Sequence, residues 1–165
     1  MGSLDHLSGF PLRQEMFEPN NKTIQKDKPV LTLASVSGGK DSTAMLLRLL
    51  EEGRQVDEIL FCDTGLEFPQ MYAHLEKLER YIGRPITRLK APYTFEQYFY
   101  EYQAKGDAAL VTNRGLSWPS RACRWCTGRL KAHVIAKHLQ GLKRQYRLVQ
   151  YVGIAADEAN RCKDL

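Results

Sequence analysis

The sequence predicts an α/β fold with a parallel β-sheet, and three observations lead to this class. An apolar run at residues 30–34 is followed by a glycine-rich turn and then by a helical pattern of apolar residues at 42–52. Residues 57–62 then predict a second strand, and two parallel strands joined by one helix form a βαβ unit. The alternation of strand-like and helical patterns then continues along the chain. This order favours a parallel sheet flanked by helices.

The remaining elements follow from the spacing of the apolar residues. The helix at 42–52 is apolar nearly all round, which predicts burial against the sheet, and Gly53 is placed to end it. Residues 70–81 have amphipathic helical spacing, and residues 94–105 predict a helix with an aromatic face that packs on the domain. The later elements are strands at 86–90 and 146–152 and a helix at 131–140 that Gly141 stops.

Length and composition indicate one soluble domain. The chain has 165 residues, 43% of them apolar and 26% charged, and no run of 18 or more apolar residues occurs. Because the N-terminus also lacks a signal-peptide pattern, we expect a cytoplasmic protein with no membrane segment. Four cysteines at uneven spacing argue against a disulfide framework. We expect a flexible arm at 1–29 and one nucleotide-binding domain at 30–165, truncated at its C-terminus.

Positive charge is concentrated in one part of the chain. Residues 108–156 contain nine Lys or Arg and no Asp or Glu, whereas the whole chain has a net charge of +5. Such a block favours an anionic substrate, and a nucleic-acid partner would give the same pattern. A solvated surface is the structural alternative.

The glycine-rich turn after the first strand is the first candidate site. Two glycines allow a tight bend that leaves backbone N–H groups unpaired at the start of a helix, where they and the helix dipole attract phosphate. Hydroxyls and one lysine at the same point add donors and charge. The expected nucleotide-binding residues here are Ser35, Ser37, Gly38, Gly39, Lys40, Asp41 and Ser42.

Two other phosphate motifs do not fit this turn. In a Walker A loop the first glycine would fall at Ala34, and the residue after the lysine is Asp41 instead of Ser or Thr. The dinucleotide pattern G-x-G-x-x-G is also absent.

A second group of candidates follows the strand at 57–62. Because the carboxyl ends of parallel strands meet at one edge, we expect Asp63, Thr64 and Gly65 beside the glycine-rich turn. Asp63 can accept a hydrogen bond from a ribose hydroxyl or an exocyclic amine, and Gly65 permits close backbone approach. An Asx-type turn that caps the next helix explains the same residues equally well. Cys62 is expected to be a small buried apolar residue.

Residues 113–131 form an irregular stretch rich in turn formers, arginine and tryptophan. We favour an active-site loop over a purely structural one. Cys126 is the candidate reactive thiol because Arg129 and Lys131 follow it, and positive neighbours favour a thiolate. Cys123 and Cys126 form a C-x-x-C pair that has a metal interpretation as well. Zinc or an iron–sulfur cluster needs further ligands, and the available residues are Cys62, Cys162, His133 and His138. A redox dithiol is the third interpretation.

The last strand also ends in polar residues. Gly153 follows it directly, and Asp157, Glu158 and Arg161 come next. These side chains can orient a nucleotide or hold a magnesium ion, although an acidic pair at a helix N-terminus is the simpler explanation.

Four motifs occur in a fixed order: SGGKDS at 37–42, FCDTGLEFP at 61–69, RWCTGRLK at 124–131 and GIAADE at 153–158. In these the sequence resembles the phosphoadenosine phosphosulfate (PAPS) reductase family of the PP-loop ATP pyrophosphatase superfamily. The resemblance implies a three-layer, doubly wound, mostly parallel sheet of the Rossmann-like adenine nucleotide α-hydrolase type. It also implies that Arg129 and Lys131 contact anionic groups of the nucleotide.

The family implies an enzyme of sulfur metabolism, an oxidoreductase or transferase that binds ATP or PAPS. The leading hypothesis is reduction or transfer of the sulfo group of an adenylyl-sulfate, with a thioredoxin-like thiol reductant as partner. ATP pyrophosphatase-type adenylation of an acceptor, either sulfate or a nucleic acid for sulfur insertion, is the alternative and would need Mg²⁺. A non-catalytic nucleotide-binding or nucleic-acid-binding subunit is the third hypothesis. Zinc or an iron–sulfur cluster would require cysteines from a longer chain, and oligomerisation is left open.

Overall fold

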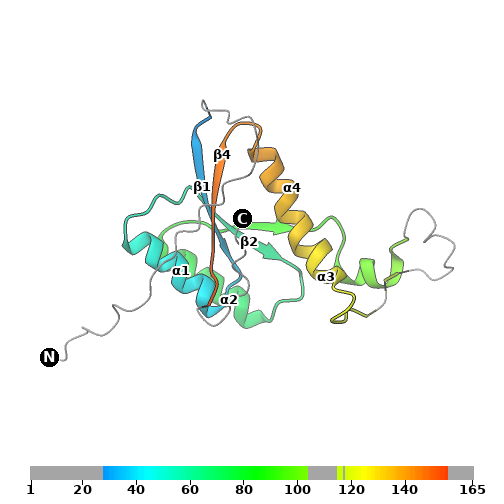
Figure 1. Ribbon diagram of the computed structural model, residues 1–165. Helices are drawn as coiled ribbons and strands as arrows, with labels where there is room; N and C mark the ends of the chain where they lie inside the picture. Colours follow the sequence, from blue (N-terminus) through cyan, green and yellow to red (C-terminus); the bar gives the residue numbers. More distant parts are fainter. Residues whose placement is uncertain (1–27, 104–114, 117, 156–165) are drawn as a thin grey trace.

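The computed structural model describes residues 28–103, 115–116 and 118–155, and these form a four-stranded parallel sheet with helices on both faces (Figure 1). The predicted α/β class is therefore confirmed. Its elements in chain order are β1 (Val30–Val36), α1 (Lys40–Glu51), β2 (Glu58–Asp63), α2 (Pro69–Ile82), β3 (Thr87–Lys90), the π-helical turn η1 (Gln97–Glu101), α3 (Trp125–Thr127), the π-helical turn η3 (Gly128–Ala132), α4 (His133–Leu142) and β4 (Arg147–Val152).

The strand order is β3-β2-β1-β4, which places the first strand in the interior of the sheet. Val36 of β1 pairs with Phe61 of β2, while Ser35 pairs with Val152 of β4 on the other side. The chain thus leaves β1 in one direction for β2 and β3, and it returns on the opposite side as β4. In open parallel sheets, ligands bind at the carboxyl ends of the strands where the strand order reverses. That point lies between β1 and β4.

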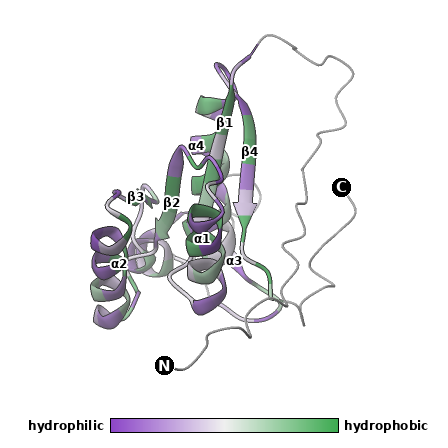
Figure 2. Cartoon of the chain, turned by 90° about the vertical axis from the view of Figure 1, so that its left-hand side faces the viewer, coloured by the Kyte–Doolittle hydropathy of each residue, from purple (hydrophilic) through white to green (hydrophobic). Residues whose placement is uncertain are grey.

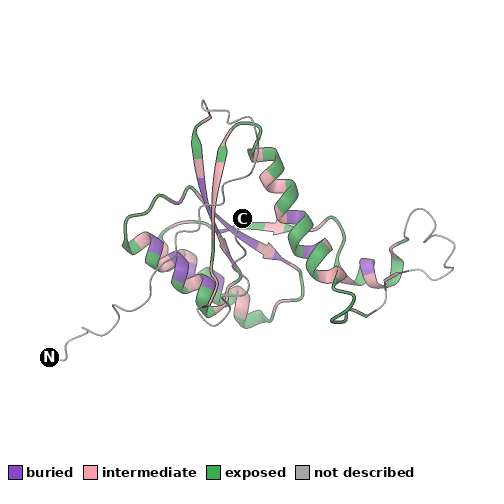
Figure 3. Cartoon of the chain, in the orientation of Figure 1, coloured by how far each residue is buried: buried purple, intermediate pink, exposed green. Residues whose placement is uncertain are grey.

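The main core fills the face of the sheet covered by α1 and α2. Ala34 and Val36 of β1 and Ile59 and Phe61 of β2 alternate with residues that point the other way. Figure 2 shows α1 and α2 on this face, and Figure 3 shows buried residues in α1 and the central strands. The helices contribute Met45, Leu46, Leu49, Leu75 and Leu78 to the same cluster. Gly53, with φ of +65°, follows the end of α1 as predicted.

The opposite face is covered by the segment from α3 to α4 (Figure 2). Leu33 and Leu60 point to this face because they alternate with the residues of the main core. Leu130 and Val134 are the buried residues of the covering helix. No helix of the described residues is long and apolar enough to cross a membrane.

Three helix predictions need correction. The first helix begins at Lys40 instead of Ser42, because Gly39 has extended backbone angles and serves as N-cap. The helix expected at 94–105 is helical only up to Glu101, and the residue that follows, Tyr102, is extended. Residues 104–105 lie outside the described residues.

The third correction concerns the expected loop at 113–131 and helix at 131–140. α3, η3 and α4 form one continuous helical segment that runs through Gly141 to Leu142, so residues 125–131 are not irregular. A glycine inside a helix costs about 1 kcal/mol. Burial of Leu130 and Val134 against the sheet outweighs that cost, since each buried side chain contributes about 1.5–3 kcal/mol.

Candidate functional site

The turn between β1 and α1, called here the β1–α1 loop (residues 37–39), presents an open helix N-terminus. Gly38 has φ of +76°, which only glycine adopts without strain, and among the described residues no side chain caps α1. The N–H groups of the first turn of α1 therefore have no partner within the helix. Lys40 and Asp41 of that turn are exposed. The geometry is that of an anion site, with Lys40 adding positive charge.

Ser42 holds the loop in shape. Its buried Oγ accepts a hydrogen bond from the Ser37 N–H at 3.0 Å and donates to the Gly39 carbonyl at 3.1 Å. The same Oγ lies 3.1 Å from Ser37 Oγ, and the Gly39 N–H donates to Ser37 Oγ at 3.4 Å. The Ser42 hydroxyl is thus used within the loop, whereas Ser37 is exposed.

The start of α2 packs against the loop. A Cβ at Gly38 would overlap the Met71 sulfur, so the two segments are in direct contact. One turn further on, His74 Nε2 lies 3.3 Å from Thr43 Oγ1 of α1. These contacts place the first two turns of α2 beside the loop, and the position expected for Asp63, Thr64 and Gly65 beside it stays a prediction.

The end of β4 approaches the loop from the other side. A Cβ on Gly153 would lie 2.8 Å from Ser42 Cα, 2.9 Å from Ser42 N and 3.0 Å from Asp41 O. Two backbones can come this close only without a side chain between them. Gly153 therefore lies directly against the first turn of α1, which follows the β1–α1 loop. Asp157, Glu158 and Arg161, predicted to follow it in the site, lie outside the described residues.

Asp63, at the end of β2, is buried, and both of its carboxylate oxygens have polar partners. Its Oδ1 accepts hydrogen bonds from Tyr72 Oη at 2.7 Å and from the Gly65 N–H at 2.9 Å, and Lys90 Nζ lies 3.3 Å from Oδ2. Burial alone would raise the pKa of this carboxyl, but the bonds from Tyr72, Gly65 and Lys90 hold the pKa below its ordinary value. The hydrogen bond to Asp63 raises the pKa of Tyr72.

The Asx-type turn is present, because Gly65 has φ of +76° and donates to Asp63 two residues earlier. The side chain of Thr64 is also occupied, since its hydroxyl donates to Glu67 Oε1 at 3.1 Å. A nucleotide contact for either residue stays a prediction.

Cys62 and Lys131 join β2 to the helix on the other face. Cys62 Sγ donates to the Lys131 carbonyl at 3.7 Å, and Lys131 Nζ lies 3.7 Å from Glu67 Oε1. Burial raises the pKa of the Cys62 thiol, and the charge of Lys131 opposes that shift. Cys62 is half-buried instead of fully buried, which departs from the sequence prediction. Lys131 therefore lies at the carboxyl end of β2.

Arg129 contacts aromatic rings. Its guanidinium lies over the rings of Tyr102 and Tyr98, at 4.3 and 5.4 Å from their centroids. A guanidinium held this way keeps its N–H groups free to bind an anion. Cys126, one turn earlier, is half-buried, and Cys123 is exposed.

The described residues contain no group of three or more His, Cys, Asp or Glu that could hold a metal ion. His138, one of the expected extra ligands, lies 3.2 Å from Glu58 at the start of β2, whereas Cys62 lies near the other end of that strand. The metal interpretation of Cys123 and Cys126 stays a prediction.

Ser35 faces away from the loop. Its Oγ accepts a hydrogen bond from the Gln150 side chain of β4 at 2.7 Å, on the face that α4 covers. Its expected nucleotide contact stays a prediction.

Several residues of the site were missed from the sequence: Met71, Tyr72, His74, Lys90, Tyr98, Tyr102 and Gln150. Lys90 ends a parallel strand, so the rule that pointed to Asp63 would have found it. The others depend on which helix faces which strand, and no local pattern marks them.

Comparison with known proteins identifies relatives. The sequence profile of the phosphoadenosine phosphosulfate reductase domain matches residues 32–150. An uncharacterized protein of Methanocaldococcus jannaschii is 32% identical over 114 residues, which are 68% of this chain and 20% of that protein. A second protein of the same organism is 29% identical over 125 residues, or 74% and 26% of the two chains. An uncharacterized 37.8 kDa protein of Escherichia phage 186 is 32% identical over 115 residues, or 68% and 31%. The chain thus spans less than a third of the length of these curated relatives.

Proposed function

Because the chain belongs to the phosphoadenosine phosphosulfate reductase domain family, we propose that it binds an adenine nucleotide with its phosphates at the β1–α1 loop and acts on the sulfo group of an adenylyl-sulfate. The observation that carries this proposal is the uncapped N-terminus of α1, with Lys40 exposed in its first turn and Gly153 close behind it. Backbone N–H groups and the helix dipole bind the anionic part of the nucleotide. Lys90 and Lys131 add positive charge at the carboxyl end of the neighbouring strands.

Reduction of the sulfo group uses a thiol. The Cys126 thiolate attacks the sulfur, the S–O bond to the nucleotide phosphate breaks, and the nucleotide leaves with the bonding electrons. A thioredoxin-like thiol then attacks Cys126 Sγ and releases sulfite, so the two thiols are oxidised to a disulfide. The loop holds the nucleotide throughout, and Arg129 and Lys131 stabilise the negative charge of the leaving phosphate.

A second candidate is adenylation by ATP, which Asp41 favours. This carboxylate is exposed in the first turn of α1, and carboxylate oxygens suit the Mg²⁺ that accompanies ATP. An acceptor oxygen would attack the α-phosphorus, and pyrophosphate would leave towards the loop.

Binding and product assays test the proposal. We expect Lys40→Ala to weaken binding of ATP and PAPS by about tenfold or more, since a charge-assisted contact contributes about 1.5–3 kcal/mol. Lys137→Ala is the matched control, because Lys137 is exposed on α4 far from the loop in the sequence. Equal affinities in both variants would contradict phosphate binding at the loop.

The reaction is identified by its product. Sulfite release from PAPS that needs an added thiol and is lost in Cys126→Ser supports reduction. Pyrophosphate release from ATP and Mg²⁺, unchanged in Cys126→Ser, would assign adenylation and overturn reduction. Tight nucleotide binding with neither product would assign a non-catalytic subunit.

A further inference from the structure

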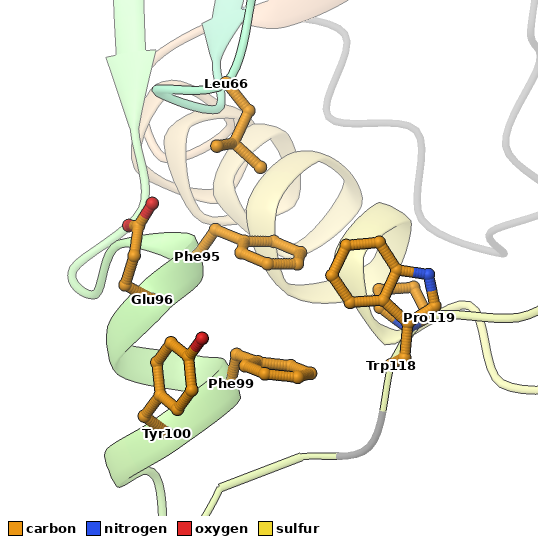
Figure 4. A pocket seen from close by; sticks show the side chains of 7 residues that line it. All are labelled: Leu66, Phe95, Glu96, Phe99, Tyr100, Trp118 and Pro119. Carbon is orange, nitrogen blue, oxygen red and sulfur yellow. The ribbon is translucent and has the colours of Figure 1, made fainter.

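A cavity lined mainly by aromatic rings adjoins the candidate nucleotide site. Its volume is about 490 Å³, and it lies between Leu66 of the β2–α2 connection, the helical segment around η1, and Trp118 with Pro119. Figure 4 shows the rings of Phe95, Phe99 and Trp118 grouped together on one side of the cavity, with Glu96 and Tyr100 on the other side. Leu66 directly follows Gly65, so the cavity begins where the Asp63 turn ends.

The aromatic rings at the cavity contact one another but leave much of their surface exposed to solvent. Trp118 stands nearly perpendicular to Phe99 and Phe95, with centroids 5.6 and 5.9 Å away. Trp118 is 71% exposed and Tyr100 is 66% exposed. Large exposed aromatic residues gathered at one cavity are uncommon on a soluble domain and mark a binding surface. A flat ring stacks on exposed aromatic faces of this kind.

One acidic residue lines the cavity, and basic residues follow the lining residues in the chain. Among the described residues that line it, Glu96 alone is charged at neutral pH, and a carboxylate accepts N–H donors while it repels anions. Arg121 and Arg124 follow Trp118 and Pro119 in the chain and are exposed. Between residues 118 and 155 the described chain has eight Lys or Arg and no Asp or Glu. A ligand with a neutral, amino-bearing ring and an attached phosphate matches this distribution.

We propose that this cavity binds the nucleobase of a second substrate, in addition to the adenine nucleotide at the β1–α1 loop. Glu96 accepts a hydrogen bond from an exocyclic amino group, and the basic segment that follows Pro119 binds the phosphate. The base can belong to a free nucleotide or to a single-stranded nucleic acid. The assignment to a second substrate rests on the proposed function, whereas base binding in the cavity does not.

Cytidine and uridine are the probes, because they differ only in the group at C4 and the proton on N3, and neither is an adenine nucleotide. We expect the full chain to bind cytidine more tightly than uridine, since only cytosine offers an amino group to Glu96. Trp118→Ala should weaken cytidine binding about 5- to 100-fold, the usual effect of removing one stacking partner. Tyr81→Ala is the matched control, because Tyr81 is 77% exposed on α2 and does not line the cavity.

Two further variants make the test specific. Glu96→Gln should reduce the preference for cytidine over uridine, and Tyr100→Ser should weaken both without changing that preference. ATP affinity should be unchanged in Trp118→Ala. A parallel weakening of ATP would mean that the cavity holds the base of ATP itself, which overturns the proposal of a second substrate.

The affinity for a single-stranded oligonucleotide, compared with that for cytidine, shows whether the base comes from a nucleic acid or from a free nucleotide. Binding at least tenfold tighter than cytidine, with a strong salt dependence reduced by Arg124→Ala, assigns a nucleic acid. Equal binding of cytidine monophosphate and the oligonucleotide assigns a free nucleotide. No binding of any of these probes would overturn the proposal. Concentration-dependent self-association that Trp118→Ala abolishes would also overturn it and would assign the cavity to a contact between copies of the chain. ATP binding by Lys40→Ala tests the proposed nucleotide site at the β1–α1 loop separately, because none of the cytidine experiments depends on that loop.

Discussion

The close approach of Gly153 to the first turn of α1 gives the sharpest test of the candidate site. Gly153→Ala adds one methyl group that would lie 2.8–3.0 Å from three backbone atoms of Asp41 and Ser42. Backbone atoms cannot rotate away as a flexible side chain can. The substitution must therefore move the end of β4 or the first turn of α1 by a few tenths of an ångström.

The cost has two parts. Overpacking of this kind destabilises a protein by about 1–3 kcal/mol. For a chain of this size that lowers the melting temperature by about 2–12 °C. If the first-turn N–H groups move, at least one hydrogen bond to a bound phosphate is weakened, and we expect nucleotide affinity to fall about 10- to 100-fold.

Calorimetric titration with ATP and thermal unfolding of the same samples measure both parts. Gly141→Ala is the matched control, because Gly141 is exposed inside α4 and a Cβ there meets nothing within 4 Å. That variant should be more stable by about 0.5–1 kcal/mol and bind ATP as the parent chain does. Equal stability and affinity of Gly153→Ala and Gly141→Ala would refute the proposed contact between β4 and the loop.

Three further predictions concern single side chains. Gly38→Ala should destabilise the fold for two reasons: its left-handed φ costs about 1–2 kcal/mol, and the added Cβ overlaps the Met71 side chain. Adding Met71→Ala should remove the overlap but not the cost of the φ angle, as measured by urea unfolding. Asp63→Asn should cost about 1–3 kcal/mol near neutral pH. Because the folded pKa of Asp63 is lowered, its stabilisation exists above the unfolded pKa of about 3.9 and is lost as pH falls through the folded pKa, so unfolding at a series of pH values should show the two proteins converging in acid. Arg129→Lys keeps the charge but loses the planar contact with the Tyr102 ring, so it should lower the free energy of unfolding in urea by about 0.5–2 kcal/mol. An unchanged free energy of unfolding would show that the cation–π contact does not stabilise the fold.

The sequence predicted what depends on local pattern. The order of strand-like and helical patterns was enough to predict the parallel sheet, whereas the contact between Gly153 and the first turn of α1 became visible only in the structure. The helix from Trp125 was missed because turn formers and arginines suggested a loop, while the deciding factor is burial of Leu130 on a face of the sheet that the sequence does not identify. Tyr72 was missed for a similar reason, because its hydrogen-bond acceptor Asp63 lies on β2 and the sequence does not show that α2 faces this strand end.

Consecutive residues of β2 serve opposite faces of the sheet, and this limits how a ligand can lie in the site. Asp63 turns toward Tyr72 of α2, on the face that carries the β1–α1 loop, while Cys62 turns toward Lys131 on the other face. A side chain within the sheet cannot reach both faces, because successive residues of a strand alternate. The two groups meet at the carboxyl edge, so a molecule that contacts both must extend across that edge. An elongated ligand with a charged end, such as a nucleotide with its phosphates, satisfies this condition, whereas a compact ion would contact one group alone.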